Sequence, residues 1–348
     1  MSNPSKLYAL GIGVGTKNKK GDWLEVFYPH PVLHPTDALC EAIASFSDLT
    51  PEHQDHLELD SAQLESLSKA IEKTGNAAQA AVIEGLKSSE RSPVICVLKE
   101  DQAPDSVPAG YLKLQLISHR LVKPHGTDIT GIFGVLPNVA WTDEGAIDLA
   151  ELTERQLAAR SSGRTLSVDC IDKFPKMTDY VVPSGIRIAD TSRVRLGAYV
   201  GEGTTVMHEG FINFNAGTEG PNMIEGRISA GVFVGTGTDF GGGCSSMGTL
   251  SGGGNIIISV GKECLLGANS GIGIGLGDRC TVEAGLYITA GTKVQIISEN
   301  KEVTGTVKAA DLSGKSDLLF RRNSSTGAVE CLTNKSVIEL NSELHAHN

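Results

Sequence analysis

Between residues 188 and 294, large aliphatic and aromatic side chains recur at intervals of six. Such a period fits neither an α-helix, which repeats every 3.6 residues, nor an amphipathic strand, which repeats every two. It is typical of a β-helix, in which each hexad forms one short strand and one turn and stacks its apolar side chain on the copy one coil above. The series breaks twice, before Ile228 and again across the glycine-rich run before Val260, and contains one four-residue step between Ile272 and Leu276. Its members are Ile188, Val194, Val200, Val206, Ile212, Ile228, Val234, Phe240, Val260, Leu266, Ile272, Leu276, Val282, Ile288 and Val294.

The chain before this repeat has a mixed pattern that predicts an α/β domain over residues 1–125. Apolar segments bounded by turn residues predict strands at 7–15, 22–28 and 91–100. Amphipathic segments preceded by capping residues predict helices, with Thr36, Asp60 or Ser61, and Asn76 as the expected caps. We therefore expect four parts: an N-terminal α/β domain (1–125), a connecting segment with one helix over 148–162 (126–180), a β-helix domain (181–297), and a C-terminal β segment with a tail (298–348).

Composition narrows the function classes. The formal net charge of −11, without a basic face or tail, argues against a nucleic-acid partner, and anionic substrates would require locally placed Arg and Lys. The seven cysteines are scattered and form no C-x-x-C pair, so we expect reduced thiols in a cytoplasmic protein. No window holds eighteen unbroken apolar residues, and we expect no membrane partner. Glycine is frequent, with 41 residues, ten of them in the segment 229–254, where it is expected at the corners of coils.

Long motifs resemble one family of acyltransferases. The segments are 206–231, GGGCSSMGTLSGGG at 241–254, CLLGANSGIGIGLGD at 264–278, 282–294 and 318–330. They resemble the longer subgroup of tetrahydrodipicolinate N-succinyltransferases, in the hexapeptide-repeat superfamily. The resemblance implies a left-handed parallel β-helix, a homotrimer with active sites between neighbouring subunits, and a role in lysine and diaminopimelate biosynthesis. The implied reaction transfers succinyl from succinyl-CoA to the amino group of ring-opened tetrahydrodipicolinate.

The same resemblance assigns site residues. Glu225 matches the proposed catalytic acid, which would accept the amine proton or attack the thioester; the sequence leaves both roles open. Gly248 matches the residue whose backbone N–H stabilises the oxyanion. The implied groove for succinyl-CoA combines basic residues, which would balance the phosphate charges of CoA, with mostly small residues that line the path. The basic residues are Arg227, Lys308, Arg321 and Arg322, and the others are Gly242, Ser245, Ala268, Glu283, Ala284, Gly291, Asn323 and Ser324.

A magnesium site at the trimer axis is the remaining implication of the resemblance. Glu209 matches one ligand position, but the position of the second acid is occupied by Ser192, with Asp190 two residues earlier. One carboxylate per chain is a poor Mg²⁺ site, although a threefold axis would supply three. His208 is the alternative general base. Arg193 and Arg195 are candidates for the carboxylates of the acceptor on charge alone.

Three other functions compete with the succinyltransferase. A related hexapeptide acyltransferase with another acyl-CoA or amine would show the same repeat. A γ-type carbonic anhydrase would need about three zinc-binding histidines, and the repeat contains only His208. A non-catalytic scaffold predicts no turnover with any acyl-CoA.

Overall fold

The computed structural model describes residues 6–45, 56–248 and 257–333, which form two compact units. The first comprises residues up to 122 together with 126–175 and 179–181. The second comprises 123–125, 176–178 and the residues from 182 onward. No helix of the described residues is long and apolar enough to cross a membrane.

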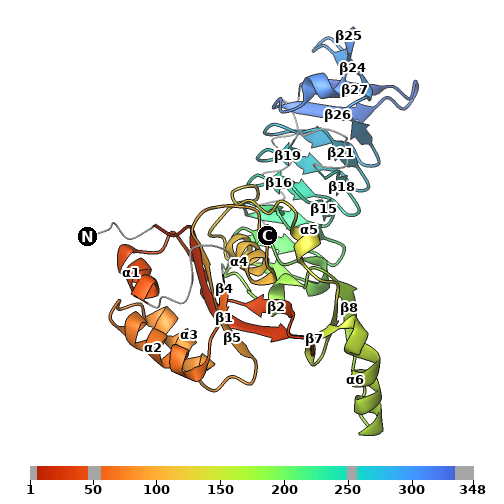
Figure 1. Ribbon diagram of the computed structural model, residues 1–348. Helices are drawn as coiled ribbons and strands as arrows, with labels where there is room; N and C mark the ends of the chain where they lie inside the picture. Colours follow the sequence, from red (N-terminus) through yellow and green to blue (C-terminus); the bar gives the residue numbers. More distant parts are fainter. Residues whose placement is uncertain (1–5, 46–55, 249–256, 334–348) are drawn as a thin grey trace. The chain divides into compact units, whose positions relative to one another are not determined.

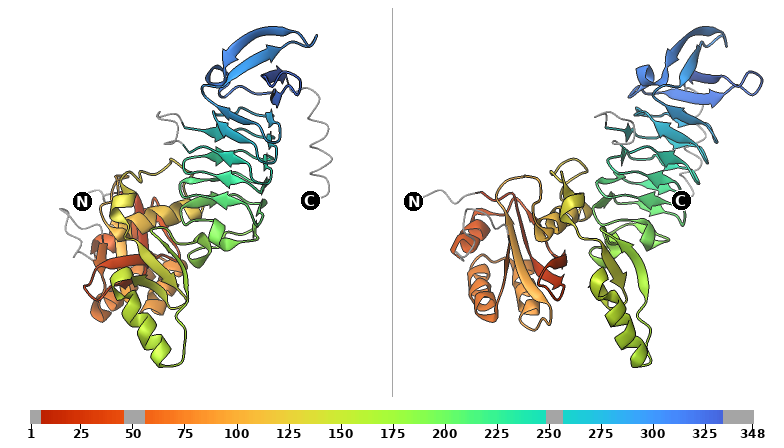
Figure 2. Two further views of the ribbon diagram at one scale, coloured as in Figure 1. Left: turned by 90° about the vertical axis from the view of Figure 1, so that its right-hand side faces the viewer. Right: turned by 45° about the vertical axis from the view of Figure 1, so that its right-hand side comes forward.

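The first unit is built on an antiparallel sheet with the strand order β2-β1-β5-β4, and β3 also pairs with β1. Leu10 and Ile12 of β1 point from one face of this sheet into an apolar core that α1, α2 and α3 complete. Figure 2 shows these three helices together on one side of the sheet. The strands are β1 (Ala9–Lys17), β2 (Trp23–Phe27), β3 (Val32–Leu33), β4 (His56–Glu58) and β5 (Ser92–Leu98).

Three helices of this unit, α1, α2 and α3, begin at the predicted caps. Asp60 caps α2 and exchanges hydrogen bonds with Gln63 in a capping box, and Asn76 caps α3 through the backbone N–H of Gln79. Thr36 Oγ1 accepts from the N–H of Leu39, 3.4 Å away, at the start of α1. The predicted strands and helices are thereby confirmed. The helices are α1 (Asp37–Ser45), α2 (Ser61–Glu72), α3 (Ala77–Leu86), α4 (Val107–Ser118), α5 (Ile132–Val135) and α6 (Leu149–Ser161).

Several elements of the first unit were not predicted, namely the short elements β3, β4 and α5, the helix α4 and a small second sheet. Helix α4 is buried on all sides, so its sequence shows no amphipathic period. A small antiparallel sheet has the strand order β7-β6-β8. Two of its strands, β6 (Val139–Thr142) and β7 (Gly145–Asp148), come before the predicted helix α6 in the sequence, and β8 (Val168–Asp172) comes after it.

The second unit is a parallel β-helix whose coils stack as flat rungs (Figures 1 and 2). Its strands form three parallel faces. The first face consists of β10 (Ala198–Val200), β13 (Ala216–Thr218), β16 (Phe233–Val234) and β19 (Ser259–Val260). The second consists of β9 (Arg187–Ile188), β11 (Thr204–Val206), β14 (Asn222–Ile224), β17 (Asp239–Phe240), β20 (Leu265–Leu266) and β22 (Thr281–Val282). The third consists of β12 (Phe211–Ile212), β15 (Arg227–Ile228), β18 (Ser245–Ser246), β21 (Gly271–Gly273) and β23 (Tyr287–Thr289).

The six-residue series marks the interior of this β-helix, as predicted. On the second face the register stacks Val206, Ile224, Phe240, Leu266 and Val282, and all five side chains are fully buried. Partners in adjacent coils lie 18, 16, 26 and 16 positions apart, because some coils are shortened and one contains an insertion. The first member of the series, Ile188, is only partly buried because it belongs to the terminal coil.

Corners of the coils adopt positive φ at repeating positions, which glycine or asparagine accommodates with little strain. Gly231, Gly237 and Gly243 have φ of +82°, +72° and +68° and are spaced by six residues. Asn215 and Asn269 occupy equivalent corners with φ of +51° and +56°. In the described part of the glycine-rich segment, Gly231, Gly237 and Gly243 therefore form turns of a regular solenoid.

Two hairpins close the far end of the coil stack (Figure 1). Strand β26 pairs in parallel with β22, and antiparallel pairs join β26 to β27 and β24 to β25. The strands are β24 (Lys293–Ile297), β25 (Val303–Lys308), β26 (Leu318–Arg322) and β27 (Val329–Thr333). The predicted tail after 333 lies outside the described residues.

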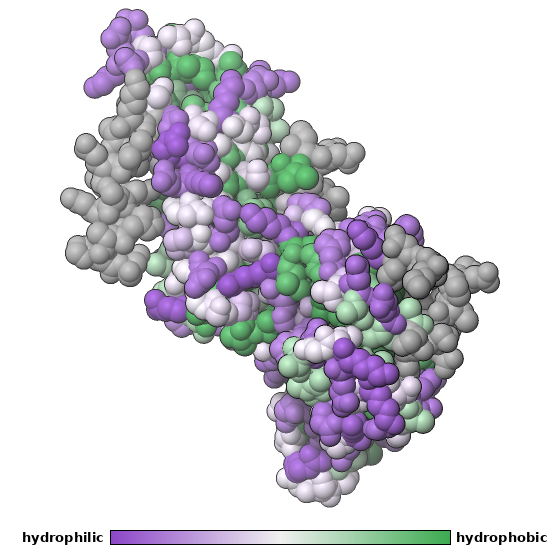
Figure 3. Space-filling view, turned by 90° about the vertical axis from the view of Figure 1, so that its left-hand side faces the viewer, coloured by the Kyte–Doolittle hydropathy of each residue, from purple (hydrophilic) through white to green (hydrophobic). Residues whose placement is uncertain are grey.

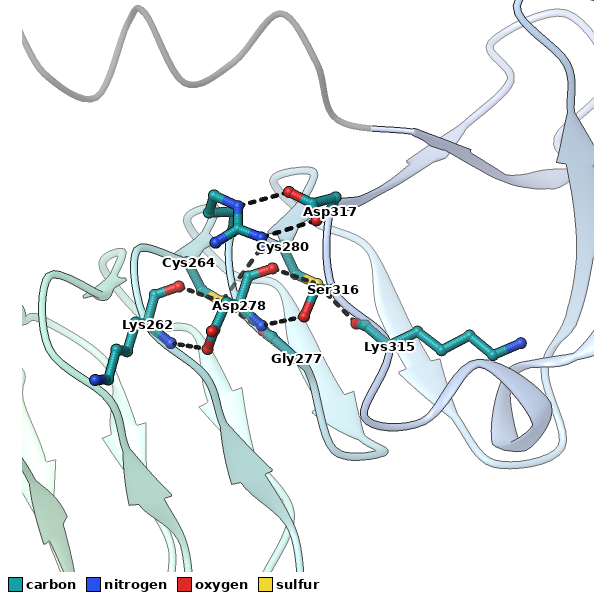
Figure 4. A network of polar contacts seen from close by, with 9 residues as sticks. Lys262, Cys264, Gly277, Asp278, Cys280, Lys315, Ser316 and Asp317 are labelled. Atoms are coloured by element: carbon teal, nitrogen blue, oxygen red, sulfur yellow. Dashed lines mark hydrogen bonds and ion pairs between the residues drawn. The ribbon is translucent and has the colours of Figure 1, made fainter.

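A polar network fastens this end to the last coils (Figure 4). Arg279 donates two hydrogen bonds to the carboxylate of Asp317, at 2.6 and 2.9 Å. The backbone N–H of Asp278 donates to Ser316 Oγ at 3.0 Å, while Asp278 Oδ1 accepts from the N–H of Lys262 at 2.8 Å. Three successive layers of chain are thereby joined through one corner.

Candidate active site

One edge of the β-helix collects most of the acidic and small candidate residues. The corners between the second and third faces, at 189–193, 207–210, 225–226, 241–244, 267–270 and 283–286, form a column that we call the candidate edge. It carries His208, Glu209, Glu225, Gly242, Ala268, Glu283 and Ala284. Residues far apart in the sequence therefore line up because the coils stack in register.

Two carboxylates converge on the side of Gly242 that has no side chain. A Cβ atom built on Gly242 would lie 3.5 Å from Glu225 Oε2 and 4.0 Å from Glu209 Oε2. Glu225 is half-buried, whereas Glu209 is exposed. The hydrogen bonds and ion pairs among the described residues do not involve either carboxylate. Both are therefore available to a ligand at this corner.

The corner that carries Glu225 is packed tightly against Cys244. A Cβ on Gly226 would lie 2.5 Å from both the carbonyl oxygen and the Sγ of Cys244, so only glycine fits. The N–H of Arg227 donates to the Cys244 carbonyl at 2.8 Å. Burial, and then the negative charge of Glu225, raise the pKa of Cys244 to about 12. Cys244 therefore stays a neutral thiol beside the Glu225 carboxylate. Its contact with this corner could not be predicted from its place between Gly243 and Ser245 in the chain.

Two further candidates meet on the third face. Arg227 and Ser245 are register partners, and the guanidinium donates to Ser245 Oγ from Nε at 3.1 Å and from Nη2 at 2.7 Å. Gly248 is the second residue after β18 and is buried. Its backbone N–H has no hydrogen bond to another described residue. The structure thus brings Arg227 and Ser245 together beside the candidate edge, whereas Gly248 lies beyond the opposite end of β18.

The C-terminal candidates form a separate group around β26. Glu283 Oε2 accepts from the N–H of Arg322 at 2.6 Å. Arg321 pairs with Glu330 at 2.8 Å, and Asn323 donates to the second oxygen of the same carboxylate at 2.8 Å. The hydrogen bond from Asn323, followed by the contacts with Arg321, holds the pKa of Glu330 below its usual range. Arg321 is therefore partly neutralised. The guanidinium of Arg322 has no acidic partner among the described residues and donates to the carbonyl oxygen of residue 327 at 3.2 Å.

The remaining groove candidates lie at the end of the coil stack. Lys308 is exposed and is the register partner of residue 293, close to Gly291 in the chain. Gly291 has open space on its Cβ side, and Ser324 is exposed in the turn between β26 and β27. Among the described residues, none of these three forms a hydrogen bond with Glu225 or Glu209.

The described residues do not fit a magnesium site. They contain no group of three or more His, Cys, Asp or Glu side chains that could hold a metal ion. Asp190 Oδ1 accepts from Ser192 Oγ at 2.6 Å and from the Ser192 N–H at 3.0 Å, so this carboxylate is satisfied locally. Glu209 is left as a single carboxylate, and Mg²⁺ prefers several oxygen ligands.

Comparisons with known proteins agree with this architecture. Family models match residues 35–134 (tetrahydrodipicolinate N-succinyltransferase N-terminal), 136–176 (the middle region of the same family) and 257–290 (hexapeptide repeat of succinyl-transferase). The last match confirms the predicted hexapeptide repeat.

Full-length relatives carry the same name. The chain is 62% identical to the 2,3,4,5-tetrahydropyridine-2,6-dicarboxylate N-succinyltransferase of Pseudomonas putida over all of both chains. It is 60% identical to that of Vibrio cholerae over 98% of this chain and 99% of the relative. The crystal structure of a Campylobacter jejuni protein assigned as a tetrahydropyridine-2-carboxylate N-succinyltransferase matches with a TM-score of 0.86 and 32% identity, covering 97% of this chain and 95% of that one. The chain is therefore an acyl-transferring enzyme that belongs to the tetrahydrodipicolinate N-succinyltransferase family.

Proposed function

We propose that this enzyme transfers the succinyl group of succinyl-CoA to the amino group of ring-opened tetrahydrodipicolinate, giving N-succinyl-2-amino-6-oxopimelate and CoA in the lysine and diaminopimelate pathway. The observation that carries the proposal is the carboxylate of Glu225, which lies beside the open side of Gly242 and has no partner among the described residues. The names of the full-length relatives supply the substrate.

In the proposed mechanism, the amine nitrogen attacks the thioester carbonyl carbon, and the carboxylate of Glu225 takes the proton that the nitrogen loses. The N–H of Gly248 donates to the oxyanion that forms on the carbonyl oxygen. The C–S bond then breaks, and CoA leaves as a thiolate that is subsequently protonated. The alternative role of Glu225, attack on the thioester to give an acyl anhydride, predicts release of CoA before the amine binds.

Succinyl-CoA is proposed to lie along the third face and its junction with β26. Arg227 is held by Ser245 and has donors to spare, and Arg322 and Lys308 provide positive charge toward the far end. Small residues line the rest of this path and leave room for the donor, namely Gly242, Ala268, Ala284 and Gly291. Glu283 is proposed to position the backbone of Arg322.

The test replaces Glu225 by Gln, which keeps size and removes the proton acceptor. We expect the kcat for acceptor-dependent CoA release to fall by about 10²–10⁴-fold, the range of general-base catalysis, with an unchanged melting temperature. Glu202→Gln, at an exposed corner between the first and second faces, is the matched control. Near-normal turnover of Glu225→Gln would remove this residue from the mechanism. A burst of one CoA per site without acceptor would assign Glu225 as the nucleophile, and no burst would assign it as the base.

We further propose the assembly features that the family implies: a left-handed coil, a homotrimer, the four-part domain division and a cytoplasmic location. The buried apolar ladder and the stacked corners suit a left-handed hexapeptide coil. Six of the seven cysteines are buried thiols, and none of the seven forms a disulfide, which suits a reducing compartment. Light scattering that gives a monomer would contradict the trimer. No step of the mechanism uses magnesium, and metal analysis of dialysed enzyme tests whether Glu209 copies bind it at a threefold axis.

A further inference from the structure

The side chain of Arg193 is fixed at the first corner of the candidate edge. Its Nη2 donates to the carbonyl oxygen of Glu209 at 2.7 Å, and its Nε donates to that of Gly210 at 3.3 Å. The guanidinium carbon lies 5.8 Å from the centroid of the Phe211 ring. These contacts hold the planar group in one orientation, against the corner that carries Glu209.

The positive charge of Arg193 is not matched by these contacts. Its hydrogen bonds go to neutral carbonyl oxygens, and it forms no ion pair with an acidic side chain among the described residues. The nearest acid in sequence, Asp190, is occupied by Ser192, whose hydroxyl and backbone hydrogen bonds are the main cause of its lowered pKa; the charge of Arg193 contributes less. In a chain of net charge −11, a half-buried guanidinium held without a counter-ion is suited to an anionic ligand.

Arg193 lies next to the two available carboxylates along the same edge. Glu209 provides the backbone oxygen that Arg193 contacts, and its side chain converges with that of Glu225 over Gly242. One fixed cation followed by two carboxylates matches a ligand that carries a carboxylate at one end and an amine further along. An amino dicarboxylate has this chemistry.

We propose that Arg193 binds a carboxylate of the amine acceptor and thereby places the amino group toward Glu225. The proposal rests on the proposed function for the identity of the acceptor and adds the residue that selects it. Arg193 acts by positioning and does not touch the transferred acyl group.

The first test compares Arg193→Gln and Arg193→Lys with Arg187→Gln, a matched control on an exposed strand of the second face. We expect Arg193→Gln to raise the KM for tetrahydrodipicolinate by about 10–100-fold, the value of a charge-assisted hydrogen bond. The KM for succinyl-CoA should stay within about twofold, because the donor is held by other residues. Arg193→Lys keeps the positive charge but lacks the planar, two-pronged donor group of arginine. Its KM for tetrahydrodipicolinate should therefore lie between those of wild type and Arg193→Gln. A parallel rise of both KM values would show a structural role and overturn the proposal.

The second test measures binding without turnover, by calorimetry with 2-aminopimelate, the acceptor skeleton without its keto group. Wild type should bind it, Arg193→Gln should bind it about 10–100-fold more weakly, and Arg187→Gln should match wild type. Replacing the contacted carboxylate by a carboxamide should weaken binding to wild type but have little effect on Arg193→Gln. Equal binding by wild type and Arg193→Gln, or no binding by wild type, would overturn the proposal. If wild type binds the probe with this dependence but transfers no succinyl group, the acceptor site stands and the proposed function fails.

Discussion

Gly242→Ala should separate the chemistry of the candidate edge from its folding. The added methyl would lie 3.5 Å from Glu225 Oε2 and 4.0 Å from Glu209 Oε2, which are ordinary contact distances. The φ of Gly242 is not in the left-handed region, so alanine fits the backbone. Replacing such a glycine commonly stabilises the folded state by about 0.4–1 kcal/mol, through the unfolded chain. The melting temperature should therefore stay the same or rise slightly.

Activity should fall despite this stability. An amine that donates to Glu225 must approach its carboxylate to about 2.8 Å, and the new methyl occupies the same side of Oε2. A displacement of about 1 Å at a reacting group costs on the order of 10²-fold in rate. We expect kcat/KM for the acceptor to fall by about 10–100-fold, which corresponds to about 1.4–2.7 kcal/mol.

Gly226→Ala provides the contrast, because its methyl would lie 2.5 Å from the oxygen and sulfur of Cys244. This overlap should cost about 1–3 kcal/mol of folding free energy and displace Glu225 as well. The assay is acceptor-dependent CoA release beside chemical denaturation of both variants. Our reasoning would be refuted if Gly242→Ala were as active as wild type, or if it lost as much stability as Gly226→Ala.

Three further outcomes follow from charge and exposure. Cys170 is the exposed cysteine, so Cys170→Ser should remove most of the rapid reaction of folded enzyme with a thiol reagent; fast labelling of Cys244, whose pKa is raised to about 12, would contradict this. Hydrogen bonds from Arg279 hold the pKa of Asp317 below its usual range, so this contribution to stability is present at neutral pH and is lost as pH falls through the lowered pKa. Asp317→Asn should therefore lower the melting temperature at pH 7 and differ progressively less from wild type as pH falls below about 3.8, the usual pKa of this carboxyl, and a constant difference would argue against the ion pair. Burial raises the pKa of Glu25 despite its hydrogen bonds, so the folded state disfavours the ionised carboxylate and loses stability as pH rises through the raised pKa. The melting temperature of Glu25→Gln, measured relative to that of wild type, should therefore increase between pH 4 and pH 7. A difference in melting temperature that stays constant over this range would contradict the prediction.

The β-helix could be predicted because a single physical requirement, an inward side chain on every short strand, recurs along 107 residues from Ile188 to Val294. The mixed N-terminal region was harder to interpret. Helices α2 and α3 begin with capping residues, so their starts could be predicted from the sequence. Helix α4 is enclosed by protein on every side and offers no polar face for a periodic pattern to reveal.

The candidate site depended on resemblance, and the residue pattern alone could not have assembled it. Glu209, Glu225 and Gly242 are separated by sixteen and seventeen positions, and only the lengths of individual coils decide that they share an edge. Arg193 was a candidate by its charge alone, whereas the structure adds that two backbone carbonyl oxygens fix the orientation of its guanidinium. Arg321 shows the reverse case, because the partner that neutralises much of its charge, Glu330, lies on the neighbouring strand.

The hairpins at the far end of the coil stack also bear on solubility. A stack of parallel rungs presents its last strand as an open template on which another copy of the chain could polymerise. Here β26 covers β22 and then reverses direction into β27, and the neighbouring β25 is exposed, short and rich in threonine and glycine. Removing this segment would uncover Val282 and the backbone of β22. The same fold would then favour fibrous aggregation, so the hairpins protect the solenoid from growing without limit.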